Sequence, residues 1–179
     1  MEEKRAKILE AFLNLINTSS DFSAFTLNSA SASLEITKGE LDLLFPYGLF
    51  QVCELLLEKH INEIEASNEQ GITNGVKMAV LSSFSLLSPY KRALRKMVKF
   101  LLLPQNAIKA PKFFWNISNA IWQKLGVNDA NFSFYSKRAI LSGIYANCFL
   151  YFLLSKNHEK LESILQKQLD LLGKLKRKY

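Results

Sequence analysis

The sequence predicts an all-α protein, and three observations support that prediction. Apolar residues recur every three or four positions along most of the chain, which is the spacing of one face of a helix. No segment keeps the alternation of apolar and polar residues, bounded by hairpin turns, that strands show. Prolines and capping residues stand where the apolar segments begin or end. The 179 residues suffice for one domain whose core needs neither disulfides nor a structural metal.

Three short helices are predicted at the start of the chain. The first covers residues 3–17 and has one apolar face. The second begins near Thr26, whose hydroxyl is expected to cap the free amides. Thr37 and Glu40 have the spacing of a capping box, which opens the third helix. This helix ends at Phe45, because the proline that follows disfavours helical backbone in the residue before it.

Six further helices are predicted after this first group. The polar residues 67–74 are the one candidate for an internal boundary between them. Prolines mark several of the helix ends, as is usual for a residue that suits the first turn and disfavours helix before it. The six helices are predicted at residues 48–66, 75–87, 89–103, 111–126, 132–154 and 158–175.

The net charge is +7, but the charge is unevenly distributed. Residues 1–69 hold five basic and twelve acidic side chains, whereas residues 70–179 hold eighteen basic and four acidic ones. Positive charge is concentrated between Lys91 and Lys112 and again between Lys174 and Lys178. Such segments are typical of contact with an anionic membrane, an acidic partner or nucleic acid, and equally of solvated helix faces.

The residues that carry most enzyme chemistry do not form a recognisable pattern. The two histidines, His60 and His158, lack the spacing of a zinc site or of a di-iron site on helices. The seven glycines are scattered rather than gathered in a phosphate-binding loop. Cys53 and Cys148 are expected to be buried thiols. The sequence therefore predicts a non-enzyme with no cofactor and no metal.

Neither a signal peptide nor a membrane span is expected. The charged N-terminus is followed by an amphipathic pattern instead of an apolar segment and a cleavage site. The uncharged residues 139–155 include Ser142, Gly143 and Asn147 and are too few to span a bilayer. The protein is expected to be soluble or peripheral to a membrane.

The first 47 residues resemble the helix-turn-helix module of TetR-type regulators. The resemblance is carried by the turn at Lys38-Gly39, by the helix end at Phe45-Pro46 and by the long helix that follows. It implies a TetR-like helical bundle, with a helix-turn-helix-like module at residues 1–47 and a helical ligand-binding domain at 48–179 in one continuous structural unit. Glu40 and Asp42 on the third helix would repel phosphate, so we expect no nucleic-acid partner.

The second half is similar to the ninth member of the Coq series, a family of lipid-binding accessory proteins in ubiquinone biosynthesis that is itself built on the TetR-like fold. Phe134 stands where the family pattern has Trp, and Ser136 stands where it has Thr. The motifs that carry the resemblance are LPQN at 103–106, AIW at 120–122, NFSFYSKRA at 131–139 and IYA at 144–146.

This resemblance implies a non-catalytic protein that binds an isoprenoid quinone precursor and presents it to the di-iron demethoxyubiquinone hydroxylase. The large apolar residues of the later helices are the candidates to line a lipid cavity, in which burial alone favours a prenyl chain. An ordinary filled core is the alternative for these residues. The candidate lipid-binding residues are Phe84, Leu87, Met97, Leu101, Phe113, Phe114, Ile117, Ile140, Ile144 and Tyr145.

A second candidate site combines aromatic and basic residues. In the family this region contacts the hydroxylase, and exposed aromatic side chains beside arginine are typical of protein interfaces. Alternatively, the aromatic side chains point inward and simply belong to the start of the helix at 132–154. The candidate partner-binding residues are Trp122, Phe132, Phe134, Tyr135, Lys137 and Arg138.

Membrane contact, self-association and location follow from the same resemblance. Many family members continue into a separate amphipathic helix, whereas this sequence stops after the last predicted bundle helix, so only weak, salt-sensitive contact with anionic lipid is expected. The final helix either contributes to the interface of a homodimer, as is usual in TetR-like proteins, or packs within its own domain. We expect a cytoplasmic protein, peripheral on the inner face of a membrane, which is the matrix side in a eukaryote.

Two other functions compete with this interpretation. A TetR-type, ligand-sensing transcriptional regulator would retard DNA at physiological salt. A helical interaction module without a cavity would show a filled core between the later helices.

Overall fold

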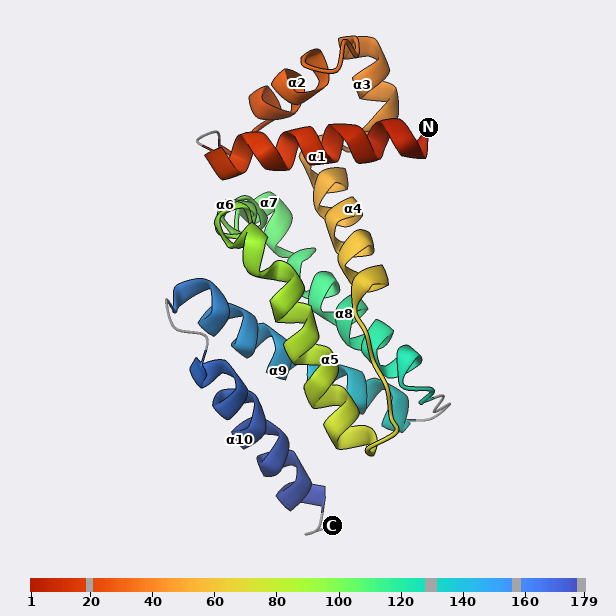
Figure 1. Ribbon diagram of the computed structural model, residues 1–179, viewed down its shortest axis with the longest axis vertical. Helices are drawn as coiled ribbons and strands as arrows, with labels where there is room; N and C mark the ends of the chain where they lie inside the picture. Colours follow the sequence, from red (N-terminus) through yellow and green to blue (C-terminus); the bar gives the residue numbers. More distant parts are fainter. Residues whose placement is uncertain (19–20, 128–131, 156–158, 177–179) are drawn as a thin grey trace. The chain divides into compact units, whose positions relative to one another are not determined.

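The computed structural model describes residues 1–18, 21–127, 132–155 and 159–176. All regular elements within these residues are helices, which confirms the predicted all-α class (Figure 1). The described residues form two compact units. The first unit contains Met1–Lys59 and Pro89–Ala107, and the second contains His60–Ser88 and Ile108–Tyr179. The domain boundary predicted between residues 47 and 48 remains a prediction. The two compact units are divided within α4, between Lys59 and His60.

The helices follow one another with short connections. Those whose residues lie largely in the first unit are α1 (Glu2–Thr18), α2 (Ala24–Ala32), α3 (Lys38–Leu44), α4 (Gly48–Glu63), α6 (Lys91–Leu101) and α7 (Pro104–Ala107). Those of the second unit are α5 (Ile72–Leu87), α8 (Ala110–Lys124), α9 (Phe132–Leu154) and α10 (Glu159–Lys176). A short 3-10 turn, η1 (Ser88–Tyr90), precedes α6.

The core of the first unit forms around one face of α1. Ile8, Phe12 and Ile16 are fully buried, as their helical spacing predicts. The α1 helix contacts α2 and α6, and Figure 1 shows it between the α2–α3 pair and α6. Phe22 makes an edge contact with Phe12 at 5.2 Å between ring centroids. The apolar face of α1 is therefore covered from more than one side.

The cap of α2 differs from the prediction. Ser23, not Thr26, is the N-cap, and its hydroxyl accepts from the Thr26 amide at 3.3 Å. Thr26 lies within the first turn and donates its own hydroxyl to the Asp21 carbonyl at 2.7 Å. Both residues have the hydroxyl that an N-cap needs, so local sequence did not decide at which of them the helix begins.

The predicted cap of α3 is confirmed at Thr37, whose hydroxyl accepts from the Glu40 amide at 3.3 Å. The Glu40 carboxylate was expected to return to the Thr37 amide, and in the structure it pairs with Lys4 Nζ of α1. A tertiary contact therefore engages the carboxylate that the capping box would have used locally.

Part of the basic segment on α6 has a structural explanation. The α6 helix buries Ala93, Leu94 and Leu101. From its other side, Arg92 donates to the Asn17 carbonyl at 3.3 Å and Lys96 donates to the Ile16 carbonyl at 3.1 Å. The last carbonyls of α1 carry the negative end of the helix dipole, so the two cations stabilise that end.

The second unit is built mainly from α5, α8, α9 and α10. The α9 helix has the predicted bounds and contacts α8, α5 and α10. Leu161, Leu165 and Leu169 of α10 are buried within the chain itself. This is the packing expected if the final helix belongs to its own domain, while the predicted homodimer remains a prediction. The side chain of Leu172 lies outside the described residues.

The α8 helix ends at Lys124, two residues before the predicted end at residue 126, and Gly126 explains why it stops. Gly126 has a φ of +72°, a conformation that glycine adopts without strain. The Gly126 amide donates to the Gln123 carbonyl at 3.0 Å, and the Val127 amide donates to the Trp122 carbonyl at 3.1 Å. These are the two hydrogen bonds of a Schellman motif, which satisfies the last carbonyls of the helix.

Gly75 of α5 lies close to the backbone of the preceding connection in the second unit. A Cβ atom at this position would lie 2.5 Å from the Ser67 carbonyl oxygen and 2.7 Å from Leu125 Cδ2. Because backbone must move to admit a methyl group, Gly75→Ala is expected to lower the free energy of unfolding by about 2 kcal/mol. Urea denaturation measures this change.

Gly143→Ala is the matched control, since Gly143 lies in α9 and a Cβ atom there meets nothing within 4 Å. This substitution is expected to raise the free energy of unfolding by about 0.5–1 kcal/mol through helix propensity. If both substitutions stabilised the protein, the close packing of α5 on the 64–71 connection would be refuted.

Candidate functional site

The interior of the second unit contains a cluster of aromatic rings. Phe84 of α5 stacks on Tyr145 of α9 at 5.0 Å between ring centroids. Phe114 of α8 lies 6.3 Å from Tyr145 and 5.7 Å from Phe149, and Phe84 lies 5.3 Å from Phe152. Offset and edge contacts at these distances stabilise aromatic pairs beyond their burial alone. The α5, α8 and α9 helices therefore meet through flat rings.

Three polar side chains from different helices meet inside this apolar interior. We call His60 of α4, Ser83 of α5 and Tyr145 of α9 the polar triangle. His60 Nε2 lies 2.8 Å from Ser83 Oγ and 3.3 Å from the Tyr145 hydroxyl. Ser83 Oγ and the Tyr145 hydroxyl are 2.5 Å apart. All three residues are buried, so each of these hydrogen bonds replaces water that the groups have lost.

Burial determines the ionisation of this interior. It lowers the pKa of His60 to about 4, with a smaller contribution from the positive charge of Lys124, so the imidazole is neutral at physiological pH. It raises the pKa of Tyr145 well above its ordinary value, although the hydrogen bond from Ser83 opposes this. Burial also raises the pKa of Cys148 to about 11. The site therefore offers neutral donors and acceptors rather than a charge or a thiolate.

Five of the predicted lipid-binding residues are buried in the second unit, namely Phe84, Phe113, Ile117, Ile144 and Tyr145. Two others there, Leu87 and Phe114, are half-buried. Ile140 is 41% exposed, so the expectation that it faces an interior is wrong. Met97 and Leu101 belong to the first unit, so the structure does not gather all ten residues within one unit.

The predicted partner-binding residues divide into exposed and buried ones. Tyr135 is 64% exposed, whereas Trp122 and Arg138 are buried and therefore do not form the exposed rim that was expected. Phe134 and Lys137 are half-buried. The side chain of Phe132 lies outside the described residues, so its predicted role is untested.

Arg138 joins α8 to α9 from inside the protein. Its Nε donates to Asn119 Oδ1 at 2.7 Å, and one of its terminal nitrogens donates to the Phe134 carbonyl at 3.0 Å. The guanidinium carbon lies 3.3 Å from the centroid of the Phe134 ring. An arginine stacked on an aromatic face in this way is held by cation–π attraction as well as by hydrogen bonds. Arg138 is therefore a positioning residue for Phe134 and the start of α9.

Near the start of α9 lies an aromatic pair, of which only Tyr135 was a predicted partner-binding residue. Trp115 of α8 stacks with Tyr135 of α9 at 6.4 Å between ring centroids. Trp122 instead donates its indole N–H to the Lys137 carbonyl at 3.2 Å, which ties it into the α8–α9 contact. Tyr135 is thus the exposed ring of this pair, and Trp115 is half-buried beside it.

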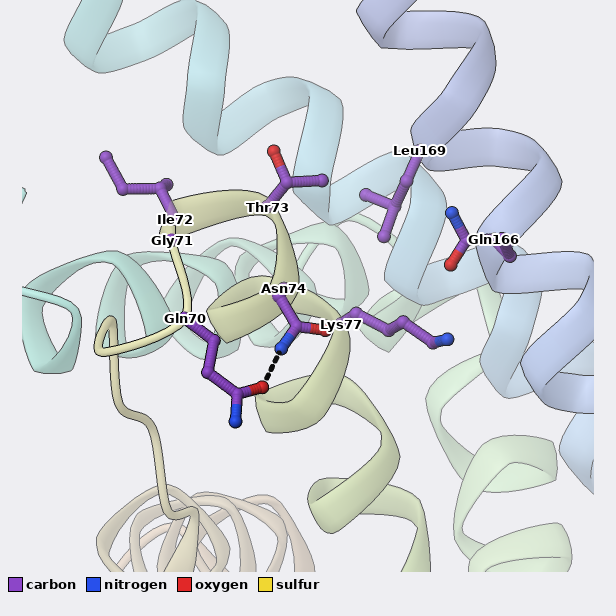
Figure 2. Close-up of a pocket in the computed structure, with 8 residues that line it drawn as sticks. All are labelled: Gln70, Gly71, Ile72, Thr73, Asn74, Lys77, Gln166 and Leu169. Carbon is purple, nitrogen blue, oxygen red and sulfur yellow. Dashed lines mark hydrogen bonds between the residues drawn. The ribbon is translucent and has the colours of Figure 1, made fainter.

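Two surface cavities are lined by residues that belong to neither predicted site. One, of about 410 Å³, is formed where the start of α5 meets α10, and Figure 2 shows its polar side chains and Leu169 around the opening. Asn74 donates to Gln70 across its edge at 2.7 Å, and Lys77 pairs with Glu162 at 2.8 Å. Its lining is Gln70, Gly71, Ile72, Thr73, Asn74, Lys77, Gln166 and Leu169, none of which was predicted to bind lipid.

The other cavity, also of about 410 Å³, belongs to the first unit. It is lined by Met1, Glu3, Lys4, Glu40, Leu43 and Leu44, again without a predicted lipid-binding residue. Within the described residues, no three His, Cys, Asp or Glu side chains gather in a way that would hold a metal ion. None of the helices in that part of the chain has the length and apolar character needed to cross a bilayer.

Sequence reasoning missed two members of the polar triangle. His60 was considered as a candidate ligand of a zinc or di-iron site, and Ser83 was not singled out. Their spacing along the chain gives no sign that they meet, since 23 positions separate them and 62 separate Ser83 from Tyr145. The available signal was a histidine on an otherwise apolar helix face, because a buried polar group requires a partner.

Comparison with known proteins finds a family match in the second half of the chain. Residues 107–176, which include α8, α9 and α10, match the family model described as COQ9. The chain is 25% identical over 163 residues to the Dictyostelium discoideum protein named "Probable ubiquinone biosynthesis protein coq9, mitochondrial", covering 84% of this chain and 53% of that one.

A second relative is the Xenopus tropicalis protein named "Ubiquinone biosynthesis protein COQ9, mitochondrial". It is 29% identical over 96 residues, which are 53% of this chain and 30% of the relative. The chain thus spans about half the length of one relative, and less of the other. These matches confirm the resemblance that the sequence motifs predicted: residues 107–176 match the COQ9 family model, and the chain is similar to two proteins named for ubiquinone biosynthesis.

Proposed function

We propose that this chain is a non-catalytic, lipid-binding accessory protein of ubiquinone biosynthesis. The observation that carries the proposal is the apolar, aromatic interior formed by α5, α8 and α9, two of which lie in the segment that matches the COQ9 model. Phe84, Ile144 and Tyr145, predicted to bind lipid, lie in that interior. The ligand proposed is an isoprenoid quinone precursor.

Burial of a prenyl chain would supply most of the binding free energy. Each methylene group that leaves water contributes roughly 0.8 kcal/mol, so one isoprene unit contributes several kcal/mol before the cost of ordering the chain. The neutral state of His60 and Tyr145 suits such a ligand, because a buried charge would have to be desolvated beside it.

The proposed partner is the di-iron demethoxyubiquinone hydroxylase, which the family resemblance implies. The stacked pair of Trp115 and Tyr135 supports a contact surface here, since aromatic side chains that are partly exposed serve as anchors in protein interfaces. Arg138 would hold this surface in place from beneath rather than contact the partner itself. A homodimer remains a further proposal.

The proposed location is the matrix side of a mitochondrial membrane. In support, both relatives are named as mitochondrial proteins. Contact with anionic lipid is proposed to be weak and to decrease with salt. It would rest on exposed cations of α6 such as Arg92, Arg95 and Lys99.

We expect lipid to co-purify with the protein. Mass spectrometry of an organic extract of the purified protein should find a quinone, a prenyl compound or a phospholipid, at a molar ratio well above that from an unrelated helical protein purified in parallel. An extract with none of these species would count against the proposed function.

A TetR-type ligand-sensing regulator is the competing function, and the third helix argues against it. Glu40 and Asp42 both lie on α3, with Glu40 paired to Lys4, so this helix presents carboxylates where a DNA-reading helix needs cations. Retarded migration of duplex DNA at physiological salt would favour the regulator over the proposed function.

A further inference from the structure

The α6 helix ends in two leucines that the protein leaves exposed. Leu102 is 67% exposed and Leu103, the next residue, is 42% exposed. The Leu102 amide still donates to the Val98 carbonyl at 2.9 Å, so helical backbone reaches this residue. Leu102 follows Lys99 by three positions and Lys99 follows Arg95 by four, so these three side chains lie along one side of the helix.

Hydrogen bonds hold the backbone on both sides of the two leucines. The buried Asn106 donates its side-chain amide to the Phe100 carbonyl at 3.0 Å. The backbone amides of Asn106 and Ala107 donate to the Leu103 carbonyl at 2.8 and 2.9 Å. The corner between α6 and α7 therefore has a defined backbone, and it presents Leu102 and Leu103 outward instead of folding them into the core.

The same segment is strongly cationic. Hydrogen bonds to the end of α1 account for Arg92 and Lys96, but not for Lys99 or for the exposed leucines. Arg92 is exposed and uses one terminal nitrogen in its contact with α1, and a guanidinium has five N–H donors in all. Residues 89–107 contain no acidic side chain and five basic ones, which are Lys91, Arg92, Arg95, Lys96 and Lys99. A partner that meets this surface must be anionic.

The leucines distinguish between anionic partners. The phosphates of a nucleic acid would bind the cations, but they give an exposed leucine no apolar environment to enter. An anionic bilayer uses both kinds of side chain, because cations stay at the level of the headgroups while apolar side chains enter the boundary of the acyl chains. The long stems of Lys99 and Arg95 allow their charges to remain at that level.

We propose that the end of α6 is a membrane-docking face, on which Leu102 and Leu103 insert into an anionic bilayer while Arg92, Arg95 and Lys99 contact its headgroups. The inference rests on the proposed contact with anionic lipid and deepens it. It places that contact at one corner of the first unit and adds insertion of apolar side chains to attraction between charges.

The first test is co-sedimentation with vesicles made of equal parts phosphatidylcholine and phosphatidylserine, or of phosphatidylcholine alone. The wild-type protein should bind the anionic vesicles more tightly. The double variant Leu102→Ser, Leu103→Ser should bind them at least tenfold more weakly, because burial of the leucines is lost. The double variant Arg95→Gln, Lys99→Gln should bind about twenty-five-fold more weakly, since each basic residue near such a surface contributes about fivefold.

Leu43→Ser is the matched control for the leucine variant. Leu43 lies on α3 of the same unit and is 77% exposed, but it is not part of the docking face. This substitution should leave vesicle binding unchanged. All of the substituted side chains are exposed, so the variants are expected to keep the fold, and circular dichroism checks this.

A second measurement detects insertion directly. A fluorophore that responds to polarity is attached to Leu102→Cys, and Leu43→Cys serves as the control site. The native thiols Cys53 and Cys148 are buried, so the introduced thiol is the accessible one. The emission of the label at position 102 should shift to the blue on anionic vesicles and not on duplex DNA, whereas the label at position 43 should not shift.

The outcomes separate the inference from the contact on which it rests. If the wild-type protein does not bind anionic vesicles at low salt, the proposed membrane contact fails. If it binds them, but the leucine variant binds equally well or the label at position 102 shows no shift, the contact is electrostatic alone and the inference is overturned. Tighter binding to duplex DNA than to the anionic vesicles would assign the face to nucleic acid and would overturn the inference as well.

Discussion

Replacing Arg138 with alanine is expected to lower the free energy of unfolding by about 4 kcal/mol, the largest effect of any substitution considered. The side chain is 1% exposed, so its removal opens a large space in the contact between α8 and α9. It also removes the hydrogen bonds from the guanidinium to Asn119 Oδ1 and to the Phe134 carbonyl. A hydrogen bond from a charged group contributes about 1.5–3 kcal/mol. Thermal unfolding followed by circular dichroism should show the midpoint falling by about 10 °C.

Two further variants identify the cause of that loss. Arg138→Met fills much of the space without the hydrogen bonds and should recover part of the stability. Arg95→Ala removes an exposed arginine from α6 and should change the free energy of unfolding by no more than about 0.5 kcal/mol. Equal effects of Arg138→Ala and Arg95→Ala would mean that the buried contacts of Arg138 do not stabilise the protein.

Acidification is expected to destabilise the protein through His60. Its native pKa is about 4, below the ordinary value of 6.5, because burial and the nearby Lys124 disfavour the imidazolium. The unfolded state therefore binds more protons, and the stabilisation that is complete above pH 6.5 is lost as the pH falls towards 4. A shift of this size corresponds to about 3 kcal/mol in total, of which about 2 kcal/mol is lost between pH 7.5 and 5. Urea denaturation at a series of pH values measures the slope.

His60→Gln tests whether the histidine is responsible. Glutamine keeps a hydrogen-bonding group near Ser83 and Tyr145 but does not titrate, so the variant should be less stable at pH 7.5 and should lose little more stability by pH 5. A variant that kept the full pH dependence of the wild-type protein would assign the effect to other groups.

The site was predicted less completely than the fold. Phe84, Phe113, Ile117, Ile144 and Tyr145 were recognised as interior residues because they are large and apolar at helical spacing. Ile140 has the same chemistry and lies on the same helix as Ile144, yet it is exposed. Periodicity identifies an apolar face, but the width of the face that is covered depends on which neighbouring helices pack against it.

Burial of charged and aromatic residues was harder to predict. The sequence Phe134-Tyr135 followed by Lys137-Arg138 indicated an exposed surface, whereas Arg138 is buried and Tyr135 is exposed. Arginine is almost never fully buried without partners. Its partners here, Asn119 and the Phe134 carbonyl, become available only after α8 packs on α9.

The helical class, the bounds of α9, the cap at Thr37 and the similarity to COQ9 proteins could all be predicted from the amino-acid sequence. These features depend on residues close together in the chain, through helical periodicity, local hydrogen bonds and short motifs. The pairing of Glu40 with Lys4, the burial of Arg138 and the meeting of His60, Ser83 and Tyr145 depend instead on how the helices pack. Each of these contacts joins residues from different helices, and the free energy of such a contact does not depend on their separation along the chain.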